Sequence, residues 1–472
     1  MNKWSISQDR SIPLYQKIMV LTEEKIKTGE LKPGTRLPAE RKLAEDLKVN
    51  RSTVIRAMEE LTAQGVLTRK KGSGTYVNPD KWGLQTKPLI NWGTSLTNDS
   101  LKRNSDYQQA VARLRERKQE QDKIIDLSNG NLPADLLPEL QSPSLSWKEL
   151  IQQEKEQSPL NSGIHSLRES VQLYLKKTYQ MEVPIEEIMI TSGTQNALFL
   201  ISQGLLKPGD AVGIEAPSYF YSLRLFQAAG LRIIPISMDA EGMTIKGLQE
   251  ASINYPLKMI FLNPIFQNPT GLVMSSKRKA DILDYCLMKR IPIVEDDAYG
   301  ALSFDQSVDN SPLKKMDQRQ QVIYLGTLSK LAGNHLRIGW MVGPQTVLKE
   351  LADIRIQIDS DLSFLPQFMA DHFLRIEMDE HQKNIRNKLA ERARIMEKWL
   401  RIEFGEDIEF LPAKGGFHLY CLFPKKTKVE VDNILQELLK RNIVVSEVQK
   451  FGDQKNGFRL SFAHFREIFC LK

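Results

Sequence analysis

A lysine that could act as a nucleophile lies in the C-terminal half of the chain. The apolar run of residues 321–325 predicts a buried strand, so Lys330 would lie just past a strand's carboxyl end, where open α/β sheets bind ligands. Schiff-base chemistry needs a neutral amine, and both desolvation and a nearby cation lower the pKa of a lysine. Arg337 could supply that cation while binding a phosphate. A lysine in this place is more often a solvated loop residue, so these residues alone leave both interpretations open.

Two more polar stretches follow strand-like runs upstream. Residues 188–191 precede Ser192–Gln195, which would open a helix over 196–206, and the backbone N–H groups of a helix N-terminus form an anion site. The apolar run of residues 291–295 ends at Asp296. Turns with Gly and Ser are common, and acidic residues cluster around Asp296, so each stretch is a weak signal by itself.

Together these stretches resemble, in chain order, the motifs of the fold-type-I pyridoxal-phosphate (PLP) enzymes, the aminotransferase family. The motifs are Ser192–Gln195, Pro217–Tyr219, Asn268–Gly271, Asp296–Tyr299, and Gly326–Lys330 with Arg337. The resemblance implies PLP as the cofactor and an α/β domain with a mostly parallel central sheet. This pattern also fits the alternation of short β-branched runs with helical stretches from residue 188 onward.

The resemblance also implies a role for each residue. Lys330 would be the catalytic lysine that bonds covalently to PLP, and Asp296 would keep the pyridine nitrogen protonated. Tyr219 would stack on the ring, while Asn268 and Tyr299 would hydrogen-bond its phenolic oxygen. The phosphate would be held by Thr194, Gln195, Thr327, Ser329 and Arg337. Without the resemblance, Tyr219 could be a core residue and Asn268–Gly271 only a turn.

A further arginine lies near the end of the chain. Gly457–Ala463 resembles the family's strand bearing the arginine that takes the substrate α-carboxylate, which implies that role for Arg459, here toward a substrate or effector. A guanidinium meets a carboxylate with two parallel hydrogen bonds. Two features depart from the family: residues 158–165 lack its tyrosine, and the chain ends eleven residues after Ser461, where a closing helix is expected. Both departures favour regulation over turnover.

Length and charge indicate a second, N-terminal module. A chain of 472 residues exceeds one ordinary domain, and 41% hydrophobic with 26% charged residues is ordinary for a globular protein. Residues 1–79 hold 15 Lys and Arg against 9 Asp and Glu, and the remainder 50 against 49, so nearly all of the net charge of +7 is N-terminal. That asymmetry favours a polyanion-binding module, although a merely well-solvated basic domain fits the charge equally well.

Cysteine spacing and hydropathy limit the kinds of site and the cellular location that we expect. Cys286, Cys421 and Cys470 lie far apart and predict neither a disulfide framework nor a metal site. The N-terminus lacks the apolar core of a signal peptide, and no apolar run reaches the roughly 20 residues of a membrane span. We therefore expect a cytoplasmic protein that needs neither a metal nor a membrane.

Residues 1–79 predict three helices and a hairpin. Helical spacing of apolar residues runs from Pro13 to Lys27, a short helix begins near Pro38, and a third helix follows Asn50 as its N-cap. Residues 66–77 predict a small β-hairpin with a basic turn. This arrangement is a winged helix-turn-helix. Leu37–Ala44, Asn50–Val54 and Gly72–Val77 are similar to the GntR-family regulators, which implies binding to a double-stranded DNA operator.

The third helix of such a head enters the major groove and its wing meets phosphates. The expected DNA-binding residues are Arg51, Ser52, Thr53 and Arg56 on the helix and Arg69, Lys70 and Lys71 on the wing. Other interpretations remain for single residues. Arg56 could pair with Glu60, and the basic run could be a solvated turn.

The expected domains are a DNA-binding head at 1–79, a linker at 80–125 and the PLP-binding domain at 126–472. Their combination resembles the MocR subgroup of PLP-dependent transcription regulators, which implies a homodimer that senses an amino compound. The rival function is an active aminotransferase that moves an amino group between an amino acid and a 2-oxo acid. The cofactor residues are the same for both functions, so the sequence barely separates them.

Overall fold

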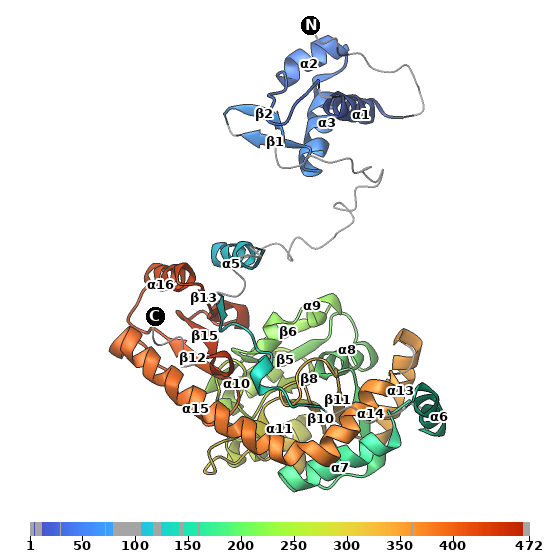
Figure 1. Ribbon diagram of the computed structural model, residues 1–472, viewed down its shortest axis with the longest axis vertical. Coiled ribbons are helices and arrows are strands. Elements are labelled where there is room, and N and C mark those ends of the chain that lie inside the picture. The colour runs from blue at the N-terminus through green and yellow to red at the C-terminus, as the bar shows by residue number, and fades with distance from the viewer. Residues whose placement is uncertain are drawn as a thin grey trace. The chain divides into compact units, whose positions relative to one another are not determined.

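The computed structural model describes residues 4, 12–28, 30–70, 72–78, 105–116, 124–140, 146–157, 161–359 and 362–465. The chain forms two compact units, Met1–Ser105 and Asp106–Lys472. Both are drawn in Figure 1, and each is described by itself below.

The first unit is the expected winged helix-turn-helix. Its elements are α1 (Leu14–Lys27), α2 (Glu40–Leu47), α3 (Arg51–Ala63), β1 (Leu67–Lys70) and β2 (Gly74–Val77), with β1 and β2 antiparallel. Asn50 caps α3, since its side chain accepts a hydrogen bond from the Ser52 N–H at 3.2 Å. The fully buried side chains of Ile18, Leu43 and Val54 join the three helices in one core.

The second unit begins at Asp106, earlier than the boundary at 126 that the sequence suggested. Helix α5 (Asp106–Glu116) places Tyr107 and Val111 in the main core of this unit. The Tyr107 hydroxyl accepts a hydrogen bond from the Val445 N–H at 3.0 Å and donates to the Val445 carbonyl at 3.3 Å. Of the predicted linker, residues 80–104 and 117–123 lie outside the described residues.

An eight-stranded sheet forms the centre of this unit, in the order β4-β11-β10-β9-β8-β5-β6-β7. Strands β10, β9, β8, β5 and β6 are parallel, whereas β11 runs antiparallel to both of its neighbours and β7 antiparallel to β6. The strands are β4 (Ile188–Thr191), β5 (Ala211–Ala216), β6 (Arg232–Asp239), β7 (Gly242–Met243), β8 (Leu257–Leu262), β9 (Ile293–Asp297), β10 (Val322–Thr327) and β11 (Gly339–Val342). The predicted mostly parallel sheet is confirmed.

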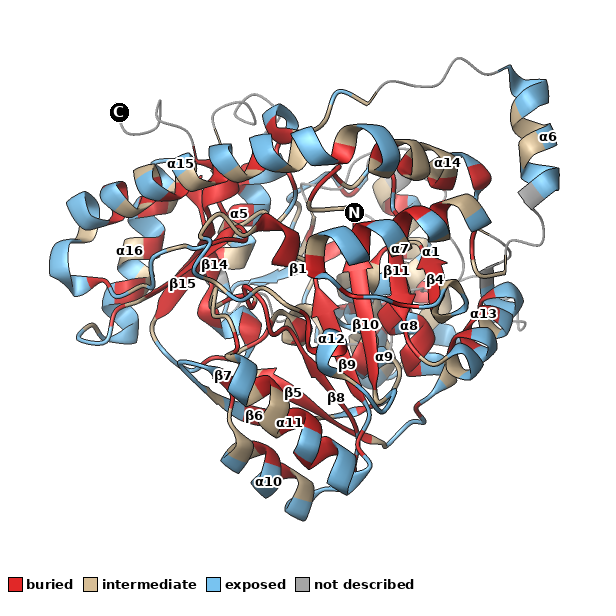
Figure 2. Cartoon of the chain, turned by 90° about the horizontal axis from the view of Figure 1, so that it is seen from below, coloured by how far each residue is buried: buried red, intermediate tan, exposed pale blue. Residues whose placement is uncertain are grey.

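Helices cover both faces of this sheet, and alternate side chains of one strand therefore enter different cores. Ile293 of β9 packs with α11 residues, while the next residue, Val294, packs with residues of α8 and α13. Strands β9 and β10 are accordingly buried throughout (Figure 2). The helices are α6 (Trp147–Gln157), α7 (His165–Tyr179), α8 (Thr194–Gly204), α9 (Leu225–Ala228), α10 (Ile245–Asn254), α11 (Ser276–Lys289), α12 (Leu313–Met316), α13 (Gln345–Asp359), α14 (Phe364–His372) and α15 (Met378–Phe404).

A smaller sheet follows α15 and carries Arg459. It has the order β12-β15-β14, formed by β12 (His418–Leu422), β15 (Gly457–Ser461) and β14 (Ser446–Glu447), all antiparallel. Helix α16 (Lys428–Lys440) packs with it, and β13 (Ile443–Val444) pairs in parallel with β3 (Ile125–Asp126). The expectation about the short C-terminus concerns residues 466–472, which lie outside the described part.

The end of β10 that leads to Lys330 is fixed by a close glycine–tryptophan contact. Gly326 lies opposite Trp340 of β11, and a Cβ on Gly326 would lie 2.3 Å from the indole ring. Trp340 itself is 1% exposed, so its ring has no free space to move into. The strand that positions Lys330 therefore requires glycine at this position.

We predict that Gly326→Ala destabilises the second unit by about 1–3 kcal/mol, since overpacking a filled core forces side chains from their rotamers. Gly343→Ala is the matched control, because its Cβ would lie 3.4 Å from Ile323 at ordinary contact distance. That change should cost less than about 1 kcal/mol. Denaturant unfolding followed by tryptophan fluorescence measures both. Equal losses in the two variants would contradict the proposed role of the Trp340 contact.

Candidate functional site

The carboxyl ends of β4, β5, β8, β9 and β10, together with the segments that follow them, surround a cavity of about 200 Å³. Every residue that the sequence assigns to the cofactor lines it. These are Thr194, Gln195, Tyr219, Asn268, Asp296, Tyr299, Thr327, Ser329, Lys330 and Arg337. Parallel strands that end at one edge bring together residues from distant parts of the chain, as the motif order implies.

One end of the cavity presents hydrogen-bond donors suited to an anion. Gly193 has a φ of +82° and turns the chain from β4 into α8, whose first amides have no carbonyl within the helix to bond. Thr327 accepts a hydrogen bond from the Ser329 N–H at 3.0 Å, which holds the two hydroxyl groups at the same end. Arg337 is exposed and lines this end, and no ion pair joins it to another of the described residues. This end can accept a phosphate.

Asp296 lies at the end of β9 and is 1% exposed. One of its carboxylate oxygens accepts a hydrogen bond from the Tyr219 hydroxyl, whereas the other, Oδ1, is buried without a partner. Burial, reinforced by the charge of Asp297, raises the pKa of Asp296 to about 7. An unpaired, buried carboxylate oxygen calls for a protonated donor in the cavity.

Lys330 carries an amine whose pKa is lowered. Its Nζ donates a hydrogen bond to the Gly130 carbonyl at 2.7 Å and lies 5.8 Å from the centre of the Tyr299 ring. Burial lowers the pKa of Lys330 to about 8, helped by the positive charge of Arg459 and opposed by Asp296. The sequence suggests Arg337 as the cation, but Arg459 is the cation that acts on this amine.

Arg459 is buried next to the cavity rather than in its lining. Its guanidinium donates to the Asn268 Oδ1 at 2.9 Å and to the Ser128 carbonyl at 2.7 Å, and it lies 4.9 Å from the centre of the Phe451 ring. Its Nε is buried without a partner. The guanidinium is therefore held in place, with its Nε–H unused.

Tyr219 and Asn268 make contacts that the motifs do not predict. Both were expected to face a cofactor ring, but here the Tyr219 hydroxyl bonds to Asp296 and the Asn268 oxygen to Arg459. Each side chain is thus paired with a charged residue. Tyr299, the third of these ring residues, pairs with His418 at 3.0 Å between its hydroxyl and Nε2.

Asn263 and His418 are two residues that we did not predict. Asn263 donates through Nδ2 to the Asp296 carbonyl at 2.5 Å, and its Oδ1 accepts from the Asn268 N–H at 2.7 Å, so it fixes two site residues at once. Its position before a proline at the end of an apolar run was the available signal. His418 has no such local signal. Burial lowers the pKa of His418 well below its usual range, so its ring is neutral beside Tyr299.

The structure tests two further expectations over the residues it describes. Within them, no group of three or more His, Cys, Asp or Glu side chains could hold a metal ion. The helices of that same part include none that combines the length and the apolarity needed to cross a membrane.

The head presents a basic surface on α3 and the wing. Arg51, Ser52 and Arg56 are exposed on α3, and Thr53 is half-buried. The Arg56 guanidinium lies 4.1 Å from the centre of the Tyr15 ring, a contact made in place of the suggested pair with Glu60. The first turn of α3 is exposed, as insertion of this helix into the major groove of DNA requires.

The wing residues lie beside this helix. Arg69 binds Glu40 at 2.9 Å, and Arg51 lies 3.9 Å from the same carboxylate, so Glu40 of α2 joins wing and helix. Lys70 is exposed, with its amine 5.2 Å from the centre of the Tyr76 ring. Lys71 lies outside the described residues. Arg69 also lies 3.6 Å from Glu59, so the two arginines and Lys70 share this face with two carboxylates.

Comparison with known protein families matches separate families to the N-terminal head and to the second unit. Residues 14–77 match the profile of the bacterial regulatory proteins of the gntR family, and residues 122–467 match aminotransferase class I and II. Among solved structures, kynurenine aminotransferase from Pyrococcus horikoshii shares the fold with a TM-score of 0.69 and 26% identity, over 81% of this chain and 95% of that one. An archaeal alanine:glyoxylate aminotransferase aligns with a TM-score of 0.64 and 28% identity, over 78% of this chain and 95% of the other.

Relatives that align with this chain over nearly its whole length are named HTH-type transcriptional regulators. The uncharacterized HTH-type transcriptional regulator YisV of Bacillus subtilis (strain 168) is 35% identical, over 98% of this chain and 95% of its own. The HTH-type transcriptional regulator NorG of Staphylococcus aureus (strain N315) is 29% identical, over 91% and 95%. The chain therefore belongs to the aminotransferase class I and II family, as one of its HTH-type transcriptional regulators with a GntR-family DNA-binding head.

Proposed function

We propose that this regulator holds PLP in the cavity between Lys330 and Asp296 and changes its DNA binding when an amino compound reaches that cavity. The observation that carries the proposal is the pairing of an amine of lowered pKa with a buried, half-unsatisfied carboxylate beside a helix N-terminus. On this proposal the protein is a PLP-dependent regulator of the MocR type.

The residues present fit PLP at its pyridine nitrogen and at its phosphate. The unpartnered Oδ1 of Asp296 would accept the pyridine N–H, and the amides at the start of α8 with Thr327, Ser329 and Arg337 would hold the phosphate. When bound, PLP supplies an electron-withdrawing ring that stabilises negative charge at the carbon of an attached amino compound. The cavity needs no other group for that task.

Lys330 is the nucleophile in this proposal. Its lowered pKa leaves part of the amine neutral near pH 7–8, and the Gly130 carbonyl accepts one of its hydrogens. Asp296 would keep a proton on the ring nitrogen, since a cationic partner favours its charged form. Tyr219 and Asn263 orient Asp296, one through the carboxylate and the other through the backbone carbonyl.

The effector is proposed to be an amino compound that carries a carboxylate. Arg459 would receive the carboxylate, and its bond to Asn268 would have to give way or be shared. We further propose a cytoplasmic homodimer that binds an operator through two heads. The ligand must then bind one arrangement of the heads more tightly than another, since a ligand with equal affinity shifts nothing.

A working aminotransferase is the second candidate function. It is favoured by the complete set of cofactor residues and by the 26% identity to a solved aminotransferase. Steady-state turnover with an amino donor and a 2-oxo acid separates the two. Turnover at the rates of ordinary enzymes, about 1–10³ s⁻¹, would favour the enzyme, and single exchanges without turnover the sensor.

We predict that borohydride reduction of the PLP-loaded protein fixes the cofactor on Lys330. Peptide mapping by mass spectrometry should find the label on that residue, and Lys330→Ala should retain at most loosely held PLP. Lys314 offers a control, because its amine is committed to Asp317 at 3.0 Å and Lys314→Ala should keep the label. A label on any other lysine would refute the assignment.

The rate of covalent PLP capture should rise with pH and level off above about 8, because only the neutral amine of Lys330 reacts. Arg459→Leu removes a charge that lowers this pKa, so the midpoint should move up. Asp296→Asn removes a charge that raises it, so the midpoint should move down. Trapping with borohydride at timed intervals across pH measures all three proteins. Shifts of the same sign in both variants would contradict this electrostatic account.

Contacts to phosphates and contacts to bases should differ in how the DNA affinity depends on salt concentration and on DNA sequence. Lys70→Ala should weaken binding to all duplexes alike and lower the slope of log affinity against log salt by about 1. Arg51→Ala should cost roughly 1–3 kcal/mol on the preferred operator and little on random DNA. Fluorescence anisotropy at several salt concentrations measures both. Equal losses on operator and random DNA would make Arg51 a phosphate contact instead.

A further inference from the structure

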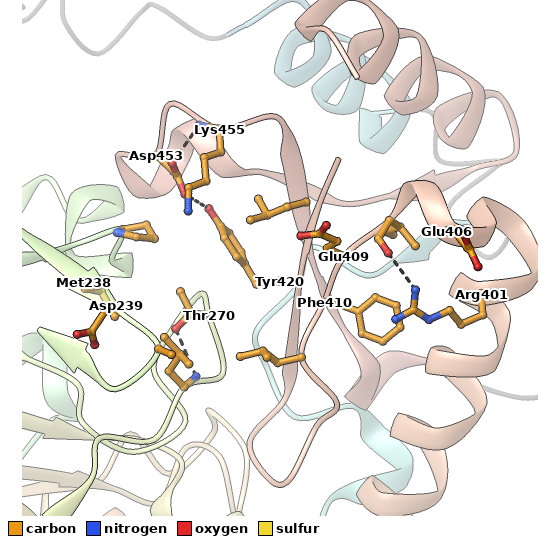
Figure 3. Close-up of a pocket in the computed structure, with 16 residues that line it drawn as sticks. Met238, Asp239, Thr270, Arg401, Glu406, Glu409, Phe410, Tyr420, Asp453 and Lys455 are labelled. Carbon is orange, nitrogen blue, oxygen red and sulfur yellow. Dashed lines mark hydrogen bonds between the residues drawn. The ribbon is translucent and has the colours of Figure 1, made fainter. Parts of the chain in front are cut away.

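A second and larger cavity, of about 650 Å³, lies where the edge of the central sheet meets the small sheet (Figure 3). One wall comes from Met238, Asp239 and Thr270, and the facing wall from Phe410, Tyr420 and Asp453. Its volume falls within the range typical of small-molecule sites. We refer to it as the seam cavity, because β6 of the central sheet and β12 of the small sheet contribute to its opposite walls.

The lining combines apolar surface with an excess of carboxylates. Apolar side chains include Met238, Leu272, Phe410, Leu411 and Leu422. The charged side chains that line the cavity are Asp239, Glu406, Glu409 and Asp453 against Arg401 and Lys455. An apolar surface with this charge balance suits a ligand with an apolar body and a positive charge.

The partners of these groups identify the carboxylates that remain available. Asp239 is neutralised by Arg278 at 2.9 Å. The Arg401 guanidinium donates to the Ile408 carbonyl at 3.0 Å and lies 4.5 Å from the centre of the Phe410 ring, so it is held against these two residues of the wall. In the described part of the chain, Glu409 makes no ion pair, and its carboxylate lies at the cavity in Figure 3.

The seam cavity shares its wall with the candidate cofactor site. Gln267 accepts hydrogen bonds from the Thr270 N–H at 3.0 Å and its hydroxyl at 2.7 Å, and donates to the Pro217 carbonyl at 2.8 Å. The next residue, Asn268, accepts from Arg459. Arg459 in turn lies opposite Tyr420 in the β12–β15 pairing. The loop therefore contacts both cavities, whereas the strand pair lines the seam cavity through Tyr420 and reaches the cofactor site only through the bond from Arg459 to Asn268.

We propose that the seam cavity binds an organic cation with an apolar body and that this binding changes the affinity of the PLP site. A ligand that touches both walls favours one spacing of the two sheets, and that spacing sets how Arg459 meets Asn268. Two sites that bias one element are coupled reciprocally. Cation binding stands without the PLP assignment, and only the coupling rests on the proposed function.

The test uses benzyltrimethylammonium, whose quaternary nitrogen cannot form a bond with the PLP aldehyde. Titration calorimetry with the full-length protein should show binding of this cation at least about fivefold tighter than of benzyl alcohol, and no preference for phenylacetate. Glu409→Gln should weaken the cation about threefold to fivefold and leave benzyl alcohol unchanged. Glu391→Gln, an exposed change on α15 outside the cavity lining, should have no effect.

Leu411 gives a test that depends little on folding, because its side chain is 56% exposed at the cavity. Leu411→Arg should repel the cation, whereas Leu411→Gln controls for the lost apolar surface. Equal binding of cation and alcohol, or an unchanged affinity in both Glu409→Gln and Leu411→Arg, would overturn the site.

The effect of the cation on the affinity for PLP is measured separately from the binding of the cation itself. Saturating benzyltrimethylammonium should change the dissociation constant for PLP at least about twofold, and PLP should change that of the cation by the same factor. Cation binding with an unchanged PLP affinity would overturn the coupling alone. Cation binding to a protein that captures no PLP at all would show that the proposed function fails while the seam site stands.

Discussion

The structure depends on keeping two oppositely charged groups, Asp296 and Lys330, in one enclosed cavity. Burial shifts both groups toward neutrality, since it raises the pKa of the aspartate to about 7 and lowers that of the lysine to about 8. Such groups are costly unless their remaining polar atoms are satisfied, and one oxygen of Asp296 is not. A cofactor with a protonated ring nitrogen and an aldehyde would satisfy both groups, and this is why we propose PLP as the ligand of the cavity.

The strands around the cavity hold these groups by backbone geometry more than by side-chain pairing. Strands β9 and β10 run in parallel and deliver Asp296 and Lys330 from the same edge, and the close approach of Trp340 to Gly326 fixes the end of β10. Asn263 then ties the loop after β8 to the backbone of Asp296. A change that moved any of these strand ends would alter the distance between amine and carboxylate.

Local patterns in the sequence predicted the mostly parallel sheet and the winged helix, and five motifs that resemble those of the aminotransferase family predicted ten of the residues that line the cavity. Their signal is local, because each follows an apolar run that becomes a strand. Contacts between residues that are far apart in the sequence could not be predicted from such local patterns. Arg459 reaches Asn268 across 191 residues, and its influence on Lys330 was assigned to Arg337 because Arg337 is nearer in sequence. His418, α5 as part of the second unit and the seam cavity likewise arise from tertiary packing that no local motif records.

The proposed function requires that the binding of an amino compound in the cavity changes the affinity for DNA. The most direct measurement is the affinity of PLP-loaded, full-length protein for an operator that it has itself selected from random duplexes, with and without a mixture of the proteinogenic amino acids. If the cavity is the sensor, the mixture changes the operator affinity of the natural protein but not that of Lys330→Ala. An equal response in the two proteins, with PLP shown to be bound only in the first, would contradict it.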